Sequence, residues 1–151
     1  MSGYLARFLR LPGRVILLLP EAVVLSAVYR YRMLRKPFEK WCGTIGVNGA
    51  ETGAERQTAE REKTILRVKK CVDVACNHTP WESKCMVRAL SAKKMLNRRG
   101  IPCTLFMGVR RDERGKMIAH AWLRCGDIYV TGGNGNSYSV TGKYGDRNPQ
   151  S

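Results

Sequence analysis

The spacing of apolar residues changes at Gly100, and this change restricts the possible folds more than any other feature of the chain. Before Gly100, apolar residues recur at helical spacing, first between residues 56 and 75 and then between 79 and 99. After it, short strand-like runs alternate with polar turns, at residues 103–110, 117–124 and 127–133, and residues 138–142 suggest a further edge strand. Helices followed by an antiparallel meander indicate an α+β fold.

The second helix has a recognisable start. In "TPWE", Thr79 would be the N-cap, Pro80 the first helical residue and Glu82 the acid of a capping box. Cys85 then falls in the second turn, whereas an N-cap at Ser83 would put it in the first turn. Gly100 ends the helix. The pattern predicts a helix that carries a cysteine near its N-terminus.

The N-terminal part is apolar and basic. The pattern of residues 4–36 predicts two helices, broken near Pro12 or Pro20. Their apolar stretch is too short and too interrupted to span a membrane. We expect four parts in the chain: a helical segment at 1–42, a Gly-rich linker at 43–55, a domain at 56–143 and a loose tail at 144–151. Residues 1–40 hold eight Lys and Arg beside this apolar stretch, which suits a partner interface or an anionic membrane face.

The net charge and the cysteine content indicate which partners and which cellular compartment suit this chain. The chain has 27 Lys and Arg against 12 Asp and Glu, a net charge of +15, which implies an acidic partner: nucleic acid, an anionic membrane or an acidic polypeptide. Six cysteines make an even number, as in a disulfide-bonded secreted domain. The chain has enough apolar residues for a core without disulfides, so we expect reduced thiols in the cytoplasm.

Cys85 and His120 are the residues most suited to catalysis. His120 lies within a predicted strand, in "AHAW", where a structural role is the simpler interpretation. A cysteine at a helix start, together with a histidine on a later strand, is nevertheless the usual arrangement of a Cys–His nucleophilic site. A nearby imidazolium and a helix N-terminus both favour the thiolate. The pattern therefore makes Cys85 a candidate nucleophile and His120 its base.

A third catalytic residue is harder to identify. A tight turn at "CGD" would place His120 opposite the Gly132–Asn134 stretch. Asn134 is then the nearest polar candidate to orient the imidazole, ahead of Asn136 and Asp127. Asn134 also reads simply as a turn residue in "GGNGN".

Two other functions compete with catalysis. One is a zinc site formed by Cys71, Cys76, His78 and Cys85, although their spacing matches no common zinc module. The other is a basic nucleic-acid-binding module, although no known nucleic-acid signature is present.

Three blocks of sequence resemble one family. Trp81, Cys85, Arg88, Ala89 and Leu90 form "W-x-x-x-C-x-x-R-A-L", and "RRGIPCTLFMGVRRD" and "AHAWLRCGDIYVTGG" follow in order. Together they resemble the lasso-peptide leader peptidases, which are transglutaminase-like, papain-related cysteine proteases. The resemblance covers roughly residues 80–133, and the N-terminus is similar to that of the stand-alone forms.

The resemblance carries specific implications. It implies Cys85 as nucleophile and His120 as base, with no cofactor or metal. Many members have an Asp about twelve residues after the histidine, where this chain has Gly132. It also implies a leader-bearing precursor peptide as substrate, a separate leader-recognition protein as partner, and a macrolactam synthetase as a further candidate partner. We expect the protein in the cytoplasm, where peripheral contact with a membrane is a further candidate interaction. We expect no nucleic-acid partner.

Overall fold

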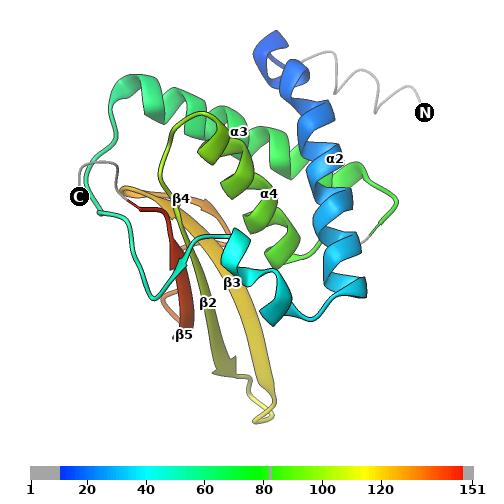
Figure 1. Ribbon diagram of the computed structural model, residues 1–151, viewed down its shortest axis with the longest axis vertical. Coiled ribbons are helices and arrows are strands. Elements are labelled where there is room, and N and C mark those ends of the chain that lie inside the picture. Colours follow the sequence, from blue (N-terminus) through cyan, green and yellow to red (C-terminus); the bar gives the residue numbers. More distant parts are fainter. Residues whose placement is uncertain (1–10, 82, 148–151) are drawn as a thin grey trace.

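Three long helices and an antiparallel sheet make up the part of the chain that the structure describes. The computed structural model describes residues 11–81 and 83–147 (Figure 1). Helices α2 (Gly13–Arg35), α3 (Ala59–His78) and α4 (Cys85–Arg98) pack on one another. Two single-turn 3₁₀ helices, η1 (Phe38–Lys40) and η2 (Cys42–Thr44), follow α2. The α+β class predicted from the change in periodicity is confirmed.

The sheet has five strands in the order β1-β5-β2-β3-β4, and every neighbouring pair is antiparallel. The strands are β1 (Val47–Asn48), β2 (Thr104–Arg111), β3 (Met117–Cys125), β4 (Ile128–Thr131) and β5 (Ser139–Gly145). The expected edge strand at 138–142 is therefore an inner strand, because β5 pairs with β2 on one side and with β1 on the other.

The core lies between the helices and one face of the sheet. Ala121, Leu123 and Cys125 of β3 are buried among side chains of α3 and α4. Because strand side chains alternate between faces, His120, Trp122 and Arg124 belong to the opposite face. The helices thus cover only one side of β3, and the candidate histidine lies on the other side.

Helix α2 differs from the expected pair of helices. The helix begins directly after Pro12 but continues through Pro20 to Arg35. Pro20 has no N–H to donate to the Ile16 carbonyl, and both residues are exposed, so water can satisfy that carbonyl. The rest of the expected first helix, residues 4–10, lies outside the described residues. None of the described helices is long and apolar enough to cross a membrane.

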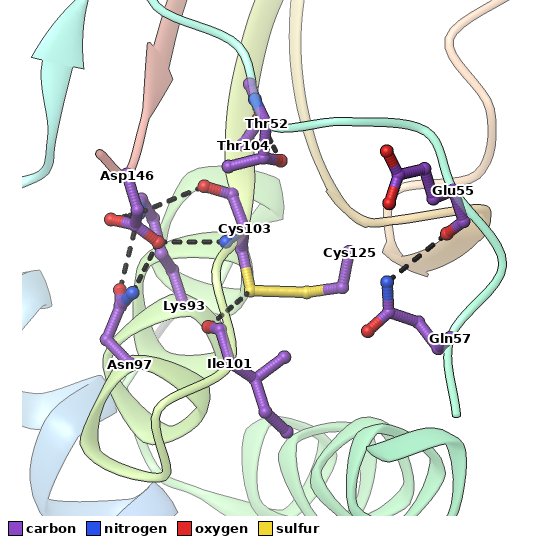
Figure 2. Close-up of a disulfide and its surroundings, with 10 residues drawn as sticks. All are labelled: Thr52, Glu55, Gln57, Lys93, Asn97, Ile101, Cys103, Thr104, Cys125 and Asp146. Carbon is purple, nitrogen blue, oxygen red and sulfur yellow. Dashed lines mark hydrogen bonds and ion pairs between the residues drawn. A yellow bond between two sulfur atoms is a disulfide. The ribbon is translucent and has the colours of Figure 1, made fainter. Parts of the chain in front are cut away.

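The expected linker and tail also take part in the fold. Within 43–55, β1 pairs with β5, and the buried Thr52 bonds to the Thr104 side chain, with 2.7 Å between the two hydroxyl oxygens. The tail begins inside β5, and Asp146 accepts hydrogen bonds from the Lys93 ammonium at 2.5 Å and from the Cys103 amide at 2.8 Å (Figure 2). Residues 43–55 and 144–147 differ from the expectation because contacts with residues far away in the sequence hold them in the fold, whereas residues 148–151 lie outside the described residues.

Candidate active site

Cys85 is the first residue of α4. Its helix starts after Lys84 as N-cap, five residues later than the cap expected at Thr79, and Thr79 instead ends α3. No acidic residue lies in the described first turn of α4. The backbone N–H groups of a first turn and the helix dipole both favour a negative charge there. Cys85 is half-buried, so its thiol lies at the boundary between core and solvent.

Arg88 and Trp81 hold the segment that leads into α4. The Arg88 guanidinium donates to the Ser83 carbonyl at 3.0 Å and to the Asn77 side-chain oxygen at 2.6 Å. The Trp81 indole N–H donates to the Ser26 hydroxyl of α2 at 3.1 Å. Residues 79–81 and 83–84, which these contacts tie to α2 and α3, are not helical, in contrast to the capping-box prediction. Glu82, the acid of that pattern, lies outside the described residues.

His120 lies in a layer of aromatic rings on the sheet face away from the helices. We call Phe106, His120, Trp122 and Tyr138 the aromatic layer. The imidazole stacks on Tyr138, with ring centroids 4.8 Å apart, and on Trp122 at 6.0 Å. Trp122 in turn stacks on Phe106 at 5.6 Å. These contacts fix the plane of the half-buried imidazole.

The carbonyl oxygen of Gly132 determines which ring nitrogen of this imidazole carries the proton. It lies 2.7 Å from Nε2 of His120. A carbonyl can only accept a hydrogen bond, so Nε2 carries the proton and donates it. In the neutral ring Nδ1 is then left as an acceptor, which is the form that a general base requires. Sequence reasoning placed His120 opposite residues 132–134 but did not predict a role for the backbone.

Gly132 can take this position because it is glycine. Its φ is +74°, and a Cβ there would lie 2.4 Å from the Ala121 carbonyl oxygen and 2.8 Å from the Trp122 Cβ. A side chain such as the Asp found in many members of the resembled family would therefore displace the backbone. At this position the backbone carbonyl of Gly132, and not a side chain, contacts the imidazole.

Two of the three side chains considered as third residues, those of Asn134 and Asp127, have other partners. The Asn134 side-chain oxygen accepts from the Asn136 amide at 3.1 Å, so these two residues stabilise their own turn. Asp127 accepts from the Gln57 amide at 3.3 Å. The described contacts include no hydrogen bond from any of the three side chains to His120. Asn134 remains a prediction, and Gly132 is the group that contacts the imidazole.

Cys85 and His120 lie on elements that pack against each other but are not hydrogen-bonded to each other in the described structure. Helix α4 packs on β3, on the face that carries Ala121 and Leu123. His120 belongs to the opposite face with Trp122. The structure therefore does not bring the Cys85 thiol and the His120 imidazole together.

The other cysteines do not form the zinc site considered above. Among the residues that the structure describes, no group of three or more His, Cys, Asp or Glu side chains is placed to hold a metal. Burial raises the pKa of Cys71 to about 12 and also raises the pKa of Cys76, which keeps both thiols protonated. Protonated thiols are poor zinc ligands.

One cysteine pair differs from the expected reduced state. Cys103 and Cys125 form a disulfide at the ends of β2 and β3 (Figure 2). Because Thr104 pairs with Arg124, the two cysteines lie directly opposite each other across the strands. Four cysteines remain free, and Cys85 is one of them.

Most of the chain matches the model of one known protein family. The family model described as the transglutaminase-like superfamily matches residues 23–142 of the 151. The matched segment includes Cys85, His120 and all of α3, α4, β2, β3 and β4. No curated protein and no solved structure matches the chain.

Proposed function

Because this chain belongs to the transglutaminase-like superfamily, which includes cysteine peptidases, we propose that it is a cysteine peptidase that removes the leader from a lasso-peptide precursor. The observation that carries the chemistry is the hydrogen bond from Nε2 of His120 to the Gly132 carbonyl, which leaves Nδ1 free to accept a proton. The narrower substrate assignment rests on the resemblance of residues 80–133 to the leader peptidases.

In the proposed mechanism, Nδ1 of His120 takes the proton of the Cys85 thiol as the sulfur attacks the carbonyl carbon of the scissile amide. The C–N bond then breaks, and the imidazolium returns the proton to the departing amine. The leader remains as a thioester on Cys85, and water activated by the same imidazole hydrolyses it. The Gly132 carbonyl holds the ring orientation in every step.

In this mechanism, Cys85 and His120 must move toward each other before they can react as a pair. The face of β3 that packs on α4 is not the face that carries His120, so β3 or the start of α4 would have to rearrange before the thiol reaches the imidazole. The hydrogen bonds of Arg88 and Trp81 control the position of the segment before Cys85. We therefore assign Arg88 and Trp81 as positioning residues, which set where the thiol stands.

The substrate assignment includes partners. A separate leader-recognition protein would present the precursor, and the macrolactam synthetase would act on the core peptide after cleavage. The net charge of +15 favours an acidic partner or an acidic leader. Activity should therefore depend on the recognition protein and weaken as salt screens the attraction.

A cleavage assay tests the proposal. The full chain would be incubated with the precursor encoded beside it and with the leader-recognition protein, and the products would be identified by mass spectrometry. We expect free leader and core peptide, loss of cleavage in Cys85→Ala, and retained cleavage in the matched control Cys42→Ala, the other half-buried free cysteine. Cleavage that persists in Cys85→Ala would rule out the mechanism.

The same assay separates hydrolysis from acyl transfer. The fold of this superfamily is typical of cysteine hydrolases and transferases. An added primary amine would appear in the product as an amide if the thioester passed its acyl group to amines. We expect a free carboxylate at the leader C-terminus, and a product that carries the amine instead would contradict the peptidase assignment.

A further inference from the structure

The outward face of α2 is apolar and exposed along its whole length. Leu17, Val24 and Tyr31 are spaced seven residues apart, which puts them on one side of the helix, and they are 80%, 60% and 60% exposed. Ile16, Val28 and Leu34 extend this surface. We call these six side chains the outer face of α2. The opposite side of the helix is buried against the core through Val15, Ala22, Leu25, Ser26 and Tyr29.

Cations outnumber carboxylates at the border of the outer face, where Glu60 of α3 lies in a pocket with Leu17 and is paired with Lys63. Arg14 and Arg32 lie along one side of it, and Arg35 and Lys36 lie at its C-terminal end. Glu21 is the only acid of α2, and it is paired with Arg99 at 2.7 Å and with Arg98 at 3.3 Å. The hydrogen bond from Arg99 lowers the pKa of Glu21, with further contributions from Arg98. The surface is thus apolar in its middle, and its border is mainly positive because the nearby carboxylates of Glu21 and Glu60 are each paired with cations.

A basic cavity lies at the C-terminal end of this face. Its volume is about 570 Å³. Four cationic side chains line it together with three others: Arg32, Arg35, Lys36, Lys40, Pro37, Trp41 and Thr44. Trp41 is buried and stacks edge-on against Phe38, with centroids 5.1 Å apart, which gives the cavity a firm wall. The cavity has the size and charge to take a phosphate-bearing group.

We propose that the outer face of α2 lies on an anionic lipid bilayer, with a lipid headgroup phosphate in the basic cavity. At about 1.5 Å per residue the helix is about 35 Å long, enough to present several turns to a flat surface. In a bilayer, the hydrocarbon layer lies next to a plane of phosphate groups. The apolar side chains of the outer face can contact the hydrocarbon while the neighbouring cations contact the phosphates. Figure 1 shows α2 at the margin of the described helices, where such a surface has access.

Lipid fits these observations better than a protein partner does. A binding partner must place negative charge around an apolar strip and also inside a cavity at one end of that strip. The phosphate groups of a phospholipid layer can do both. The inference is independent of the proposed peptidase activity, because it uses none of the residues around Cys85 and His120.

Vesicle co-sedimentation tests the proposal. The full chain would be mixed with phosphatidylcholine vesicles and with phosphatidylcholine–phosphatidylglycerol vesicles at about 0.1 M and about 1 M salt, where the screening length falls from about 10 Å to about 3 Å. We expect binding to the anionic vesicles at least about tenfold tighter than to the neutral ones, with most of that difference lost at high salt.

Matched variants locate the surface. Val24→Asp with Val28→Asp, and separately Arg32→Gln with Arg35→Gln and Lys36→Gln, should each weaken anionic-vesicle binding at least about tenfold. Leu66→Asp, an exposed apolar residue of α3, should leave binding unchanged, and so should Cys85→Ala. Circular dichroism would verify that each variant is folded.

Three results would overturn the proposal. The first is equal binding to neutral and anionic vesicles. The second is binding that both sets of α2 substitutions leave intact. The third is an α2-dependent dimer or complex with the leader-recognition protein, seen by sedimentation velocity, together with no vesicle binding.

Discussion

Nε2 of His120 lies 2.7 Å from the carbonyl oxygen of Gly132, and this contact sets the chemical form of the histidine. A main-chain oxygen cannot lose its acceptor character as pH changes, whereas an Asp side chain at the same place could be protonated. In the proposed peptidase, the backbone would therefore orient the imidazole without a negative charge to stabilise the imidazolium.

The first prediction concerns the tautomers of the two histidines. His120 should carry its proton on Nε2 at alkaline pH, because the Gly132 carbonyl accepts from that nitrogen. In His78, Nδ1 lies 2.7 Å from the Val74 carbonyl and should be the protonated nitrogen there. ¹⁵N–¹H correlation spectra of the rings distinguish the two patterns. A protonated Nδ1 in neutral His120 would exclude the proposed base.

The second prediction concerns the catalytic pair. Cys85→Ala and His120→Gln should each lower leader cleavage at least about a thousand-fold, and the double variant should be no worse than either, because neither group works without the other. Glutamine keeps a planar polar side chain against Trp122 and Tyr138. Thermal unfolding of each variant would verify the fold. Independent, multiplicative losses would mean that the two residues do not act as a unit.

The third prediction compares two neighbouring glycines. Gly132 and Gly133 have φ of +74° and +72°, so alanine at either position costs about 1 kcal/mol of backbone strain. Only at Gly132 does the new Cβ meet other atoms, namely the Ala121 carbonyl and Trp122. Gly132→Ala should therefore lower turnover about tenfold or more beyond Gly133→Ala. Equal turnover in the two variants would remove Gly132 as a positioning group.

The fourth prediction tests Asn134 as the third residue. Since its side-chain oxygen accepts from the Asn136 amide, Asn134→Ala should change turnover by less than about tenfold. Asp127→Ala, which loses the contact with Gln57, is the comparison. A loss of about a hundred-fold or more in Asn134→Ala alone would show that this side chain, and not the Gly132 carbonyl, orients His120 during catalysis.

The fifth prediction concerns the ion pair that anchors β5. Lys93 is 2% exposed, and burial lowers its pKa despite the bond to Asp146. Asp146→Asn leaves a buried ammonium without its counter-charge and should cost about 3 kcal/mol of unfolding free energy, whereas Lys93→Met should cost less. Glu51→Gln, at a more exposed ion pair, should cost at most about 1 kcal/mol. Urea titration measures all three, and the opposite ranking of Asp146→Asn and Lys93→Met would contradict the buried pair.

Local sequence determined the order of elements and the candidate catalytic pair. The helices predicted between residues 56 and 75 and between 79 and 99 are present as α3 and α4 with shifted ends, and the antiparallel strands after Gly100 are present too, because each segment carries its own spacing of apolar residues. Cys85 and His120 stood out because their residue types suit nucleophilic chemistry at a helix start and on a strand. The expected position of His120 opposite residues 132–134 agrees with its contact to Gly132.

Only the tertiary structure decided the features that depend on residues far apart in the chain. The start of α4 at Cys85 differs from the start predicted by the local capping pattern at Thr79, and the intervening Trp81 bonds to Ser26 of the distant α2. Asp146, which directly follows β5, is held by its pairing with Lys93, and the disulfide joins cysteines that the register of β2 with β3 places opposite each other. The Gly132 carbonyl could not be predicted as the partner of His120, because every residue has a carbonyl and only the fold brings a particular one within hydrogen-bonding distance.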